Sequence, residues 1–233
     1  MSEDNQQPPN NWYTNNYNRI NASAIDSGIY SKILHNFLEL PRKLAREKVQ
    51  GVTILEVGAN IGEHIPYVAR KWQSYIATDI RSPQTFQIEL IRNRGASFQV
   101  ADVENLPFID SQFDRVISTC LFHHLKNPEQ GFREIRRVVK NQGSISILIP
   151  NDPGSAYRML WKLTTLRNAG KSGLGSLAKI NHSKEHRNHY QGLMVLLNEN
   201  FKNDKIKIIG LPFILRSYSL NVLTVVYITK VDS

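Results

Sequence analysis

From Thr53 onward, short apolar stretches rich in β-branched residues alternate with stretches in which apolar residues recur at helical spacing. The apolar stretches predict strands near residues 53–58, 75–79, 97–101, 113–118 and 144–149. The stretches between them predict helices near residues 61–71, 84–94 and 128–140. Strands that alternate with helices in this way are typical of a parallel sheet, so the pattern predicts an α/β fold.

The pattern changes on both sides of this central region. Before it, apolar residues recur at helical spacing within residues 25–49, whereas the polar residues 1–20 are expected to be disordered. After Pro150 we expect a helix over residues 157–167, a loop rich in Gly, Ser and Lys, a helix near 189–200, and strands near 205–210 and 221–230. No helix separates the last two strands, which indicates an antiparallel pair.

A glycine-bearing turn, Gly58 to Gly62, follows the first predicted strand. The two glycines let the backbone turn sharply and approach a ligand, and Asn60 tolerates left-handed dihedrals better than other residues with a Cβ. Asp79 ends the next predicted strand, 21 residues after Gly58, at the spacing where an acid accepts hydrogen bonds from a ribose. A dinucleotide fingerprint would require glycine at the positions of Asn60 and Glu63, so NAD, NADP and FAD are disfavoured.

Two sequence blocks give the chain a family resemblance. Residues 56–62 (EVGANIG) resemble the E/D-x-G-x-G-x-G motif of class I S-adenosylmethionine-dependent methyltransferases, with Asn60 for the middle glycine. A second block resembles the family's small-molecule branch through residues 100–108 (VADVENLPF), 113–118 (FDRVIS), 121–125 (LFHHL), 127–128 (NP), 134–140 (EIRRVVK) and Gly143. Val139 replaces a leucine of this pattern, and Gln142 replaces the first glycine of a pair.

The resemblance covers about residues 53–150 and implies the fold of the whole chain. That fold is a Rossmann-like, doubly wound, mostly parallel seven-stranded sheet whose last strand is antiparallel. We therefore expect one methyltransferase domain over residues 21–233, with residues 25–49 as an N-terminal cap helix and residues 151–187 as a substrate-cover insertion.

The resemblance also implies where the family's cofactor, S-adenosylmethionine, would bind. Ligands of open α/β sheets lie beyond the carboxyl ends of the strands. Asp79 is expected to hold the ribose hydroxyls, and Asp102 to accept from the adenine amine. The expected cofactor-binding residues are Glu56, Gly58, Ala59, Asn60, Gly62, Asp79, Ile80, Asp102, Val103 and Thr119. For each acid taken alone, a capping or turn role is the alternative.

Two histidines and one acid are the candidate catalytic residues. His123 and His124 follow the fourth predicted strand, and Asp152 follows the fifth. Neutral imidazole is the natural base near pH 7, although an acceptor that is already nucleophilic needs no base. A histidine that only packs or caps is the alternative interpretation.

A second group of side chains is expected to line the acceptor side: Arg158, His186, His189 and Tyr190. The spacing of His182, His186 and His189 could align them on one helical face. No cysteine or second acidic group accompanies these histidines in the sequence, so no metal site is expected.

Positive charge is concentrated in one segment of the chain. Residues 126–190 hold twelve Lys and Arg against four Asp and Glu, and this segment accounts for most of the net charge of +9. Such a surface suits a phosphorylated substrate, a membrane surface or nucleic acid, and a solvated helix face is the alternative. We expect methyl transfer to an oxygen or nitrogen of an anionic small-molecule or glycan acceptor; an RNA methyltransferase and a non-catalytic S-adenosylmethionine-binding protein are the alternatives.

Composition adds an expectation about the compartment. The single cysteine, Cys120, suits a reducing cytoplasm. The apolar residues 206–228 are interrupted by Pro212, Arg216 and Asn221, so they do not read as a membrane span. We therefore expect a cytoplasmic protein that meets a membrane only peripherally, if at all.

Overall fold

The computed structural model describes residues 28–44, 50–68, 72–82, 85–171, 173–214 and 216–231. The tail predicted to be disordered, residues 1–20, lies outside the described residues, as do residues 25–27 and 45–49 of the predicted cap helix.

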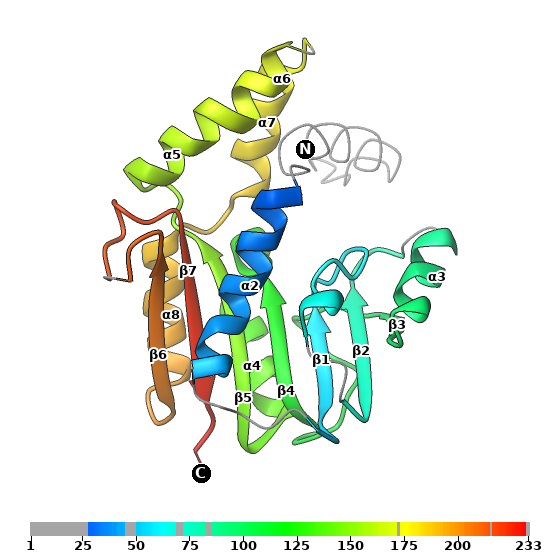
Figure 1. Cartoon of the computed structure of the whole chain (residues 1–233). Helices are drawn as coiled ribbons and strands as arrows, with labels where there is room; N and C mark the ends of the chain where they lie inside the picture. Colours follow the sequence, from blue (N-terminus) through cyan, green and yellow to red (C-terminus); the bar gives the residue numbers. More distant parts are fainter. Residues whose placement is uncertain are drawn as a thin grey trace, which may run out of the picture.

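Within the described residues, seven strands form one sheet in the order β3-β2-β1-β4-β5-β7-β6 (Figure 1). They are β1 (Thr53–Val57), β2 (Ser74–Asp79), β3 (Ser97–Val100), β4 (Phe113–Thr119), β5 (Val139–Pro150), β6 (Lys205–Leu211) and β7 (Leu223–Thr229). Strands β1 to β5 pair in parallel, and β7 pairs antiparallel with both β5 and β6. This order confirms the predicted doubly wound sheet and its antiparallel last strand.

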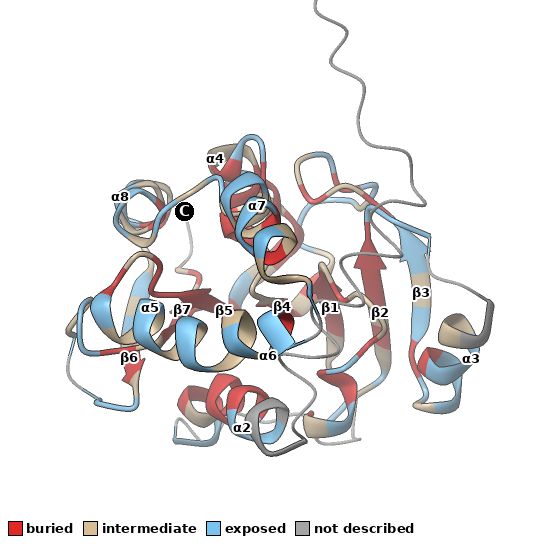
Figure 2. Cartoon of the chain, turned by 90° about the horizontal axis from the view of Figure 1, so that it is seen from above, coloured by how far each residue is buried: buried red, intermediate tan, exposed pale blue. Residues whose placement is uncertain are grey.

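Helices cover both faces of the sheet (Figure 2). Helix α2 (Gly28–Leu44) packs on one face, where its Leu34, Phe37 and Leu38 join a cluster with Ile54 of β1. Helices α4 (Pro128–Val138) and α8 (Tyr190–Asn200) pack on the other face, in a cluster with Leu55 of β1. The side chains of the neighbouring residues Ile54 and Leu55 thus point to opposite faces of the sheet, as the two-residue period of a strand requires.

The start of α4 follows from its sequence. Asn127 is the N-cap, and its side-chain oxygen accepts a hydrogen bond from the Gln130 N–H at 3.2 Å. Pro128 opens the helix, where its missing N–H costs nothing. Helix α3 (Thr85–Asn93) lies where a helix was predicted over residues 84–94. Strand β3 follows it at the edge of the sheet.

The helix predicted over residues 61–71 is the clearest local error. The chain forms turns there and a single 3-10 turn, η1 (Ile65–Tyr67), and Ala69 to Lys71 are not described. Gly62 has φ of +71°, and Val68 after η1 is extended, with ψ of 130°. Pro66 supplies no N–H for a longer helical ladder. The apolar spacing that suggested a helix serves instead to anchor Ile65 and Val68 in the core.

The segment over residues 151–187, predicted above as an insertion, is more helical than predicted. Its helices are α5 (Ser155–Trp161), the π-helical η3 (Lys162–Leu166), α6 (Arg167–Lys171) and α7 (Gly175–Glu185). Ala169 and Ala178 hold α6 and α7 together in a small apolar cluster, because small side chains let helices approach closely. Residues 155–185, which we call the arm, rise beyond the carboxyl ends of the strands (Figure 1).

The apolar residues 206–228 supply most of β6 and β7. Among the described helices, none has both the length and the apolar character required to cross a membrane.

Candidate active site

The loop after β1 adopts the left-handed conformations that its residues favour. Gly58 has φ of +67°, Asn60 of +49° and Gly62 of +71°. The expectation for Asn60 is therefore confirmed, since asparagine is one of the few residues with a Cβ that occupies this region readily. Hydrogen bonds fix the turn: Ala59 N–H donates to the Thr78 carbonyl at 2.8 Å, and Gly62 N–H donates to the Ala59 carbonyl at 2.7 Å.

Asp79, at the end of β2, holds this loop. Its Oδ2 accepts from the Asn60 N–H at 3.1 Å, and its Oδ1 accepts from the Arg81 N–H at 3.0 Å. The Arg81 side chain donates a third bond, from Nε to Oδ1 at 3.3 Å. A carboxylate offers about four lone-pair sites, so these three bonds still leave capacity for a ribose hydroxyl. Ile80, expected against the adenine, is 65% exposed beside it. Asp79 thus has the turn role that was the alternative, while retaining room for a ligand.

The third strand end places Asp102 and Val103 beside Asp79. Strands β2 and β3 pair with Asp79 opposite Val100, so Asp102 lies two residues past this register. Asp102 Oδ1 accepts from the Glu104 N–H at 2.9 Å, which makes a local turn, and Val103 is buried. Both acids therefore stand at the same edge of the sheet, where Asp79 accepts from two backbone N–H groups and Asp102 from one.

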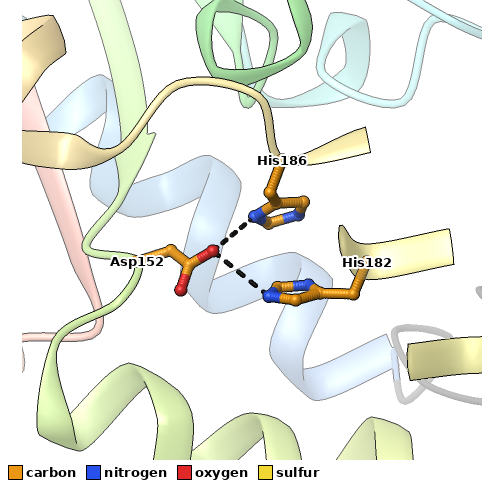
Figure 3. Close-up of side chains that lie close together, drawn as sticks. All are labelled: Asp152, His182 and His186. Carbon is orange, nitrogen blue, oxygen red and sulfur yellow. Dashed lines mark hydrogen bonds and ion pairs between the residues drawn. The ribbon is translucent and has the colours of Figure 1, made fainter. Parts of the chain in front are cut away.

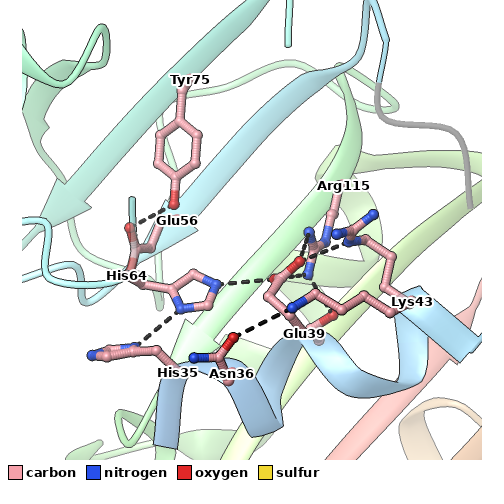
Figure 4. A network of polar contacts seen from close by, with 10 residues as sticks. His35, Asn36, Glu39, Lys43, Glu56, His64, Tyr75 and Arg115 are labelled. Atoms are coloured by element: carbon pink, nitrogen blue, oxygen red, sulfur yellow. Dashed lines mark hydrogen bonds and ion pairs between the residues drawn. The ribbon is translucent and has the colours of Figure 1, made fainter. Parts of the chain in front are cut away.

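Glu56 points into the interior instead of toward this edge. Its Oε2 accepts from the Tyr75 hydroxyl at 2.7 Å across β1 and β2, and its side chain is buried (Figure 4). Burial raises the pKa of Glu56 to about 8. The geometry thus gives Glu56 a role in joining two strands beneath the glycine loop.

The end of β4 leads into the histidines. His123 and His124 lie in the 3-10 turn η2 (Phe122–His124), with ring centroids 3.9 Å apart. His123 is 4% exposed, and its Nδ1 has no hydrogen-bond partner in the part of the chain that the structure describes. The Thr119 hydroxyl at the end of β4 is buried and equally unpartnered among those residues. Unsatisfied polar atoms of this kind indicate a place where a ligand or water is expected.

His124 has a defined proton position. Its Nδ1 lies 2.9 Å from the backbone carbonyl of Glu185, which can only accept, so Nδ1 carries the proton and Nε2 keeps the lone pair. Burial, reinforced by the neighbouring His186, lowers the pKa of His124 to about 4. His124 is therefore a neutral imidazole with a free acceptor nitrogen.

Asp152 joins this group from the residues after β5 (Figure 3). Its Oδ2 accepts from His186 Nδ1 at 2.8 Å and lies 3.2 Å from His182 Nε2. Burial opposes ionisation of Asp152, but the hydrogen bonds from His182 and His186 outweigh it and hold its pKa well below the usual range. The ring centroids of His186 and His123 are 4.4 Å apart. His123, His124, His182 and His186 therefore lie together with Asp152, and we call this group the histidine cluster.

The other expected acceptor residues lie at its border. Tyr190 N–H donates to the Asp152 carbonyl at 3.0 Å, and its ring stacks on Tyr218. Arg158 is exposed on α5, and His189 is exposed at the N-cap of α8. The predicted alignment of His189 with His182 and His186 is wrong, because α7 ends at Glu185 and His189 begins another helix.

The basic segment separates into two parts. On α4, Arg133, Arg136 and Arg137 form ion pairs with acidic side chains. On the arm, the exposed cations form no ion pair with other described residues: Arg158, Lys162, Arg167, Lys171, Lys179 and Lys184. Most of the unpaired positive charge of the basic segment therefore lies on the arm, and Lys126 and Arg187 are exposed outside it.

A buried ionic network escaped the sequence analysis (Figure 4). Glu39 of α2 accepts from Arg115 of β4 at 2.6 Å, from Arg42 at 2.7 Å and from His64 at 3.0 Å. His64 follows the glycine loop, and its other nitrogen bonds to His35 at 3.0 Å. Burial alone would raise the pKa of Glu39, but Arg115 and His64 outweigh it and hold this pKa far below its usual range. The network fastens the cap helix to the glycine loop and the sheet.

The sheet order, the left-handed loop after β1 and the acids at adjacent strand ends are those of the class I methyltransferase fold. Residues 55–147 match the protein family described as "Methyltransferase domain".

Curated relatives and a solved structure are similar to the chain. The chain is 29% identical over 140 residues to a malonyl-[acyl-carrier protein] O-methyltransferase of Geobacter sulfurreducens, covering 58% of this chain and 52% of the relative. It is 30% identical over 114 residues to a probable tRNA methyltransferase 9B of Mus musculus, covering 46% and 24%. The chain thus spans about half the length of the first relative and a quarter of the second. The CurJ carbon methyltransferase structure superposes with a TM-score of 0.61 at 17% identity, covering 93% of this chain and 58% of that one, which shows the shared fold.

Proposed function

We propose that this protein transfers the methyl group of S-adenosylmethionine to an oxygen or nitrogen of an anionic small-molecule or glycan acceptor. One observation carries the proposal: the glycine loop, the strand-end acids and the histidine cluster all lie at the carboxyl edge of the sheet. Ligands of open α/β sheets bind at that edge.

The cofactor side comprises the loop and the ends of β1 to β4. Gly58, Ala59, Asn60 and Gly62 would surround the methionine part, with Glu56 and Tyr75 supporting the strand beneath. Asp79 would hold the ribose, and Ile80, Asp102 and Val103 would hold the adenine. The Thr119 hydroxyl, which has no hydrogen-bond partner among the described residues, would bond to another polar group of the cofactor. When bound, the cofactor supplies an electrophilic methyl group on a sulfonium.

The acceptor side supplies position and a base. A hydroxyl or amine held at the histidine cluster would attack the methyl carbon as the methyl–sulfur bond breaks, which leaves a neutral thioether. The proton leaves the acceptor for the lone pair at His124 Nε2, and from there it passes to solvent. His123 is the second candidate base, and the Asp152–His186 pair orients the acceptor. Holding the reactants in contact and excluding water provides most of the acceleration.

Charge on the arm supports an anionic acceptor. The exposed cations from Arg158 to Lys184 have no described ion-pair partner, and they lie on the same arm as His182. They would attract a phosphorylated sugar, a lipid-linked saccharide or another phosphorylated metabolite. The same cations, together with the similarity to a probable tRNA methyltransferase, support RNA as the second candidate acceptor.

Calorimetry tests the cofactor half of the proposal. We expect micromolar affinity for S-adenosylmethionine or its demethylated product, about −8 kcal/mol. Asp79→Ala should weaken binding by roughly 1.5–3 kcal/mol, because a charged hydrogen-bond acceptor is lost. Tight binding of NAD with no binding of S-adenosylmethionine would refute the assignment.

A mass-spectrometric screen tests the acceptor half, with phosphorylated sugars, RNA and quinone precursors as candidates. With an acceptor identified, His124→Ala should lower kcat by about 10²–10⁴ while the cofactor dissociation constant stays unchanged. His189→Ala, at the exposed border of the site, is the matched control and should act mainly on KM. A near-normal kcat for both His123→Ala and His124→Ala would remove the base role.

A further inference from the structure

The Asp152–His182–His186 group has the composition of a metal site. His182 and His186 stand four residues apart, on α7 and at its C-cap, and their ring centroids are 4.0 Å apart. A carboxylate from a different element, Asp152, faces both rings with one oxygen (Figure 3). Two imidazoles on one helix face plus a carboxylate from elsewhere is a ligand set that divalent zinc and iron accept.

The distances fit a single ion. Asp152 Oδ2 lies 2.8 Å from His186 Nδ1 and 3.2 Å from His182 Nε2, and one ligand atom of each residue lies within 4.8 Å of the others. Ligands at about 2.1 Å from a tetrahedral or octahedral ion are separated by about 3.0–3.4 Å. Both carboxylate–imidazole distances lie near this range, so all three side chains could reach one ion once the two imidazole protons that now point at the carboxylate are lost.

The surroundings preorganise the ligands. The Asp152 side chain is 9% exposed, that of His186 is 15% and that of His182 is 24%, so the group is shielded but accessible from one side. The Trp161 ring lies 4.6 Å from the His182 ring, and Tyr157 stacks at 6.2 Å, which restricts the imidazole orientation. Supports of this kind raise metal affinity.

We propose that Asp152, His182 and His186 bind one divalent transition-metal ion of the zinc class, with its remaining coordination positions open toward the histidine cluster. Three protein ligands with an open position is the arrangement of a catalytic zinc site, whereas structural sites have four. Its role toward the acceptor rests on the proposed function: an oxygen of a hydroxyl or phosphate acceptor would occupy an open position. Metal binding itself requires no acceptor and no methyl transfer.

The sequence argument against a metal was the lack of a cysteine or a second acidic group beside these histidines. Asp152 supplies that acid from 30 residues before His182, and the arm folds back to bring them together. A purely hydrogen-bonded Asp–His–His group is the competing interpretation, and it predicts no specific affinity for metal.

Isothermal titration calorimetry of the metal-free full-length protein with Zn²⁺ distinguishes the two. We expect one equivalent to bind with micromolar or tighter affinity, and Co²⁺ to give a visible absorption band of a protein-bound ion. His182→Ala and His186→Ala should each weaken binding by about tenfold or more. His189→Ala, which alters a nearby exposed histidine outside the group, should bind Zn²⁺ like the wild type.

Because Asp152 is buried, Asp152→Asn is read only alongside circular dichroism, and the more exposed His182→Ala keeps the test valid if that variant misfolds. The proposal is overturned if folded wild-type protein binds no Zn²⁺, or if His182→Ala binds it equally well. S-adenosylmethionine affinity is measured on the same samples. Cofactor binding without Zn²⁺ binding rejects the metal site alone, whereas Zn²⁺ binding without cofactor binding rejects the methyltransferase proposal alone.

Discussion

Gly62 carries two constraints at once, left-handed backbone and close packing. A Cβ there would lie 2.6 Å from Ile65 Cδ1 and 2.8 Å from Ile91 Cγ1. Gly62→Ala should therefore lower the free energy of unfolding by more than the roughly 1–2 kcal/mol of left-handed strain. Gly95→Ala is the matched control, because Gly95 has φ of +86° with no atom within 4 Å of the added Cβ. Equal losses in urea denaturation would contradict the packing argument.

Glu56 should make stability depend on pH. Burial raises its pKa from 4.5 to about 8, so the folded state holds this proton more tightly than the unfolded state. The resulting stabilisation is complete below about pH 4.5 and is lost as the pH rises through about 8. Glu56→Gln keeps an acceptor for the Tyr75 hydroxyl and cannot ionise. The free energy of unfolding of Glu56→Gln minus that of the wild type should therefore rise steadily from pH 5 to 8.5. Parallel pH profiles of the two proteins would exclude a buried proton at Glu56.

Single residues also show where sequence reasoning stops. The left-handed backbone of Asn60 could be predicted because it reflects a local preference. The bonds that Asp79 and Asp102 accept from backbone N–H groups could not, because the sequence does not show which of several donors a carboxylate meets. Glu39 and Arg115 are 76 residues apart, and each reads as an ordinary surface charge until the fold buries them together.

At the scale of elements, the cap helix α2 depends on Glu39. The Glu39 side chain is fully buried with Arg115 and His64 around it, so Glu39→Ala should cost about 3–5 kcal/mol of unfolding free energy. Replacing both partners, Glu39→Leu with Arg115→Leu, should recover part of the loss because no buried charge then remains in that pair. Glu199→Ala, which breaks the exposed pair with Lys202, should have a far smaller effect in the same denaturation series. A Glu39→Ala loss no larger than that of Glu199→Ala would show that the network adds little stability.

The strands and most helices were predictable because their apolar residues repeat with the period of the element. Strand β1 is found at Thr53–Val57 against the predicted 53–58, and α8 at Tyr190–Asn200 against 189–200. Helix α7 was missed because Gly, Ser and Lys dominate its sequence and only Ala178 and Asn181 are buried. A helix that rests on so few contacts leaves almost no periodic signal, and its two histidines could be linked to Asp152 only through the fold.

At the scale of the whole molecule, the division of charge predicts how the acceptor is attracted. Lys162, Arg167 and Lys171 are exposed on the arm, and reversing all three to Glu should raise the acceptor KM and flatten its dependence on salt. Cofactor affinity should hardly change, because these residues lie away from the glycine loop. Arg133→Glu on α4 is the control, since Arg133 is exposed but already paired with Glu129. Unchanged acceptor kinetics at low salt in the triple variant would reduce the arm's cations to a solvated face.

Asp152 and Tyr190, which flank the arm on its two sides, are joined by a hydrogen bond from the Tyr190 N–H to the Asp152 carbonyl at 3.0 Å. The arm therefore leaves and re-enters the rest of the domain at a single point, as an inserted segment does. Lengthening such a loop adds an entropic cost that grows only with the logarithm of its length. On the proposed function, a different segment inserted at this point could select another acceptor. The sheet, the glycine loop and the strand-end acids would not have to change.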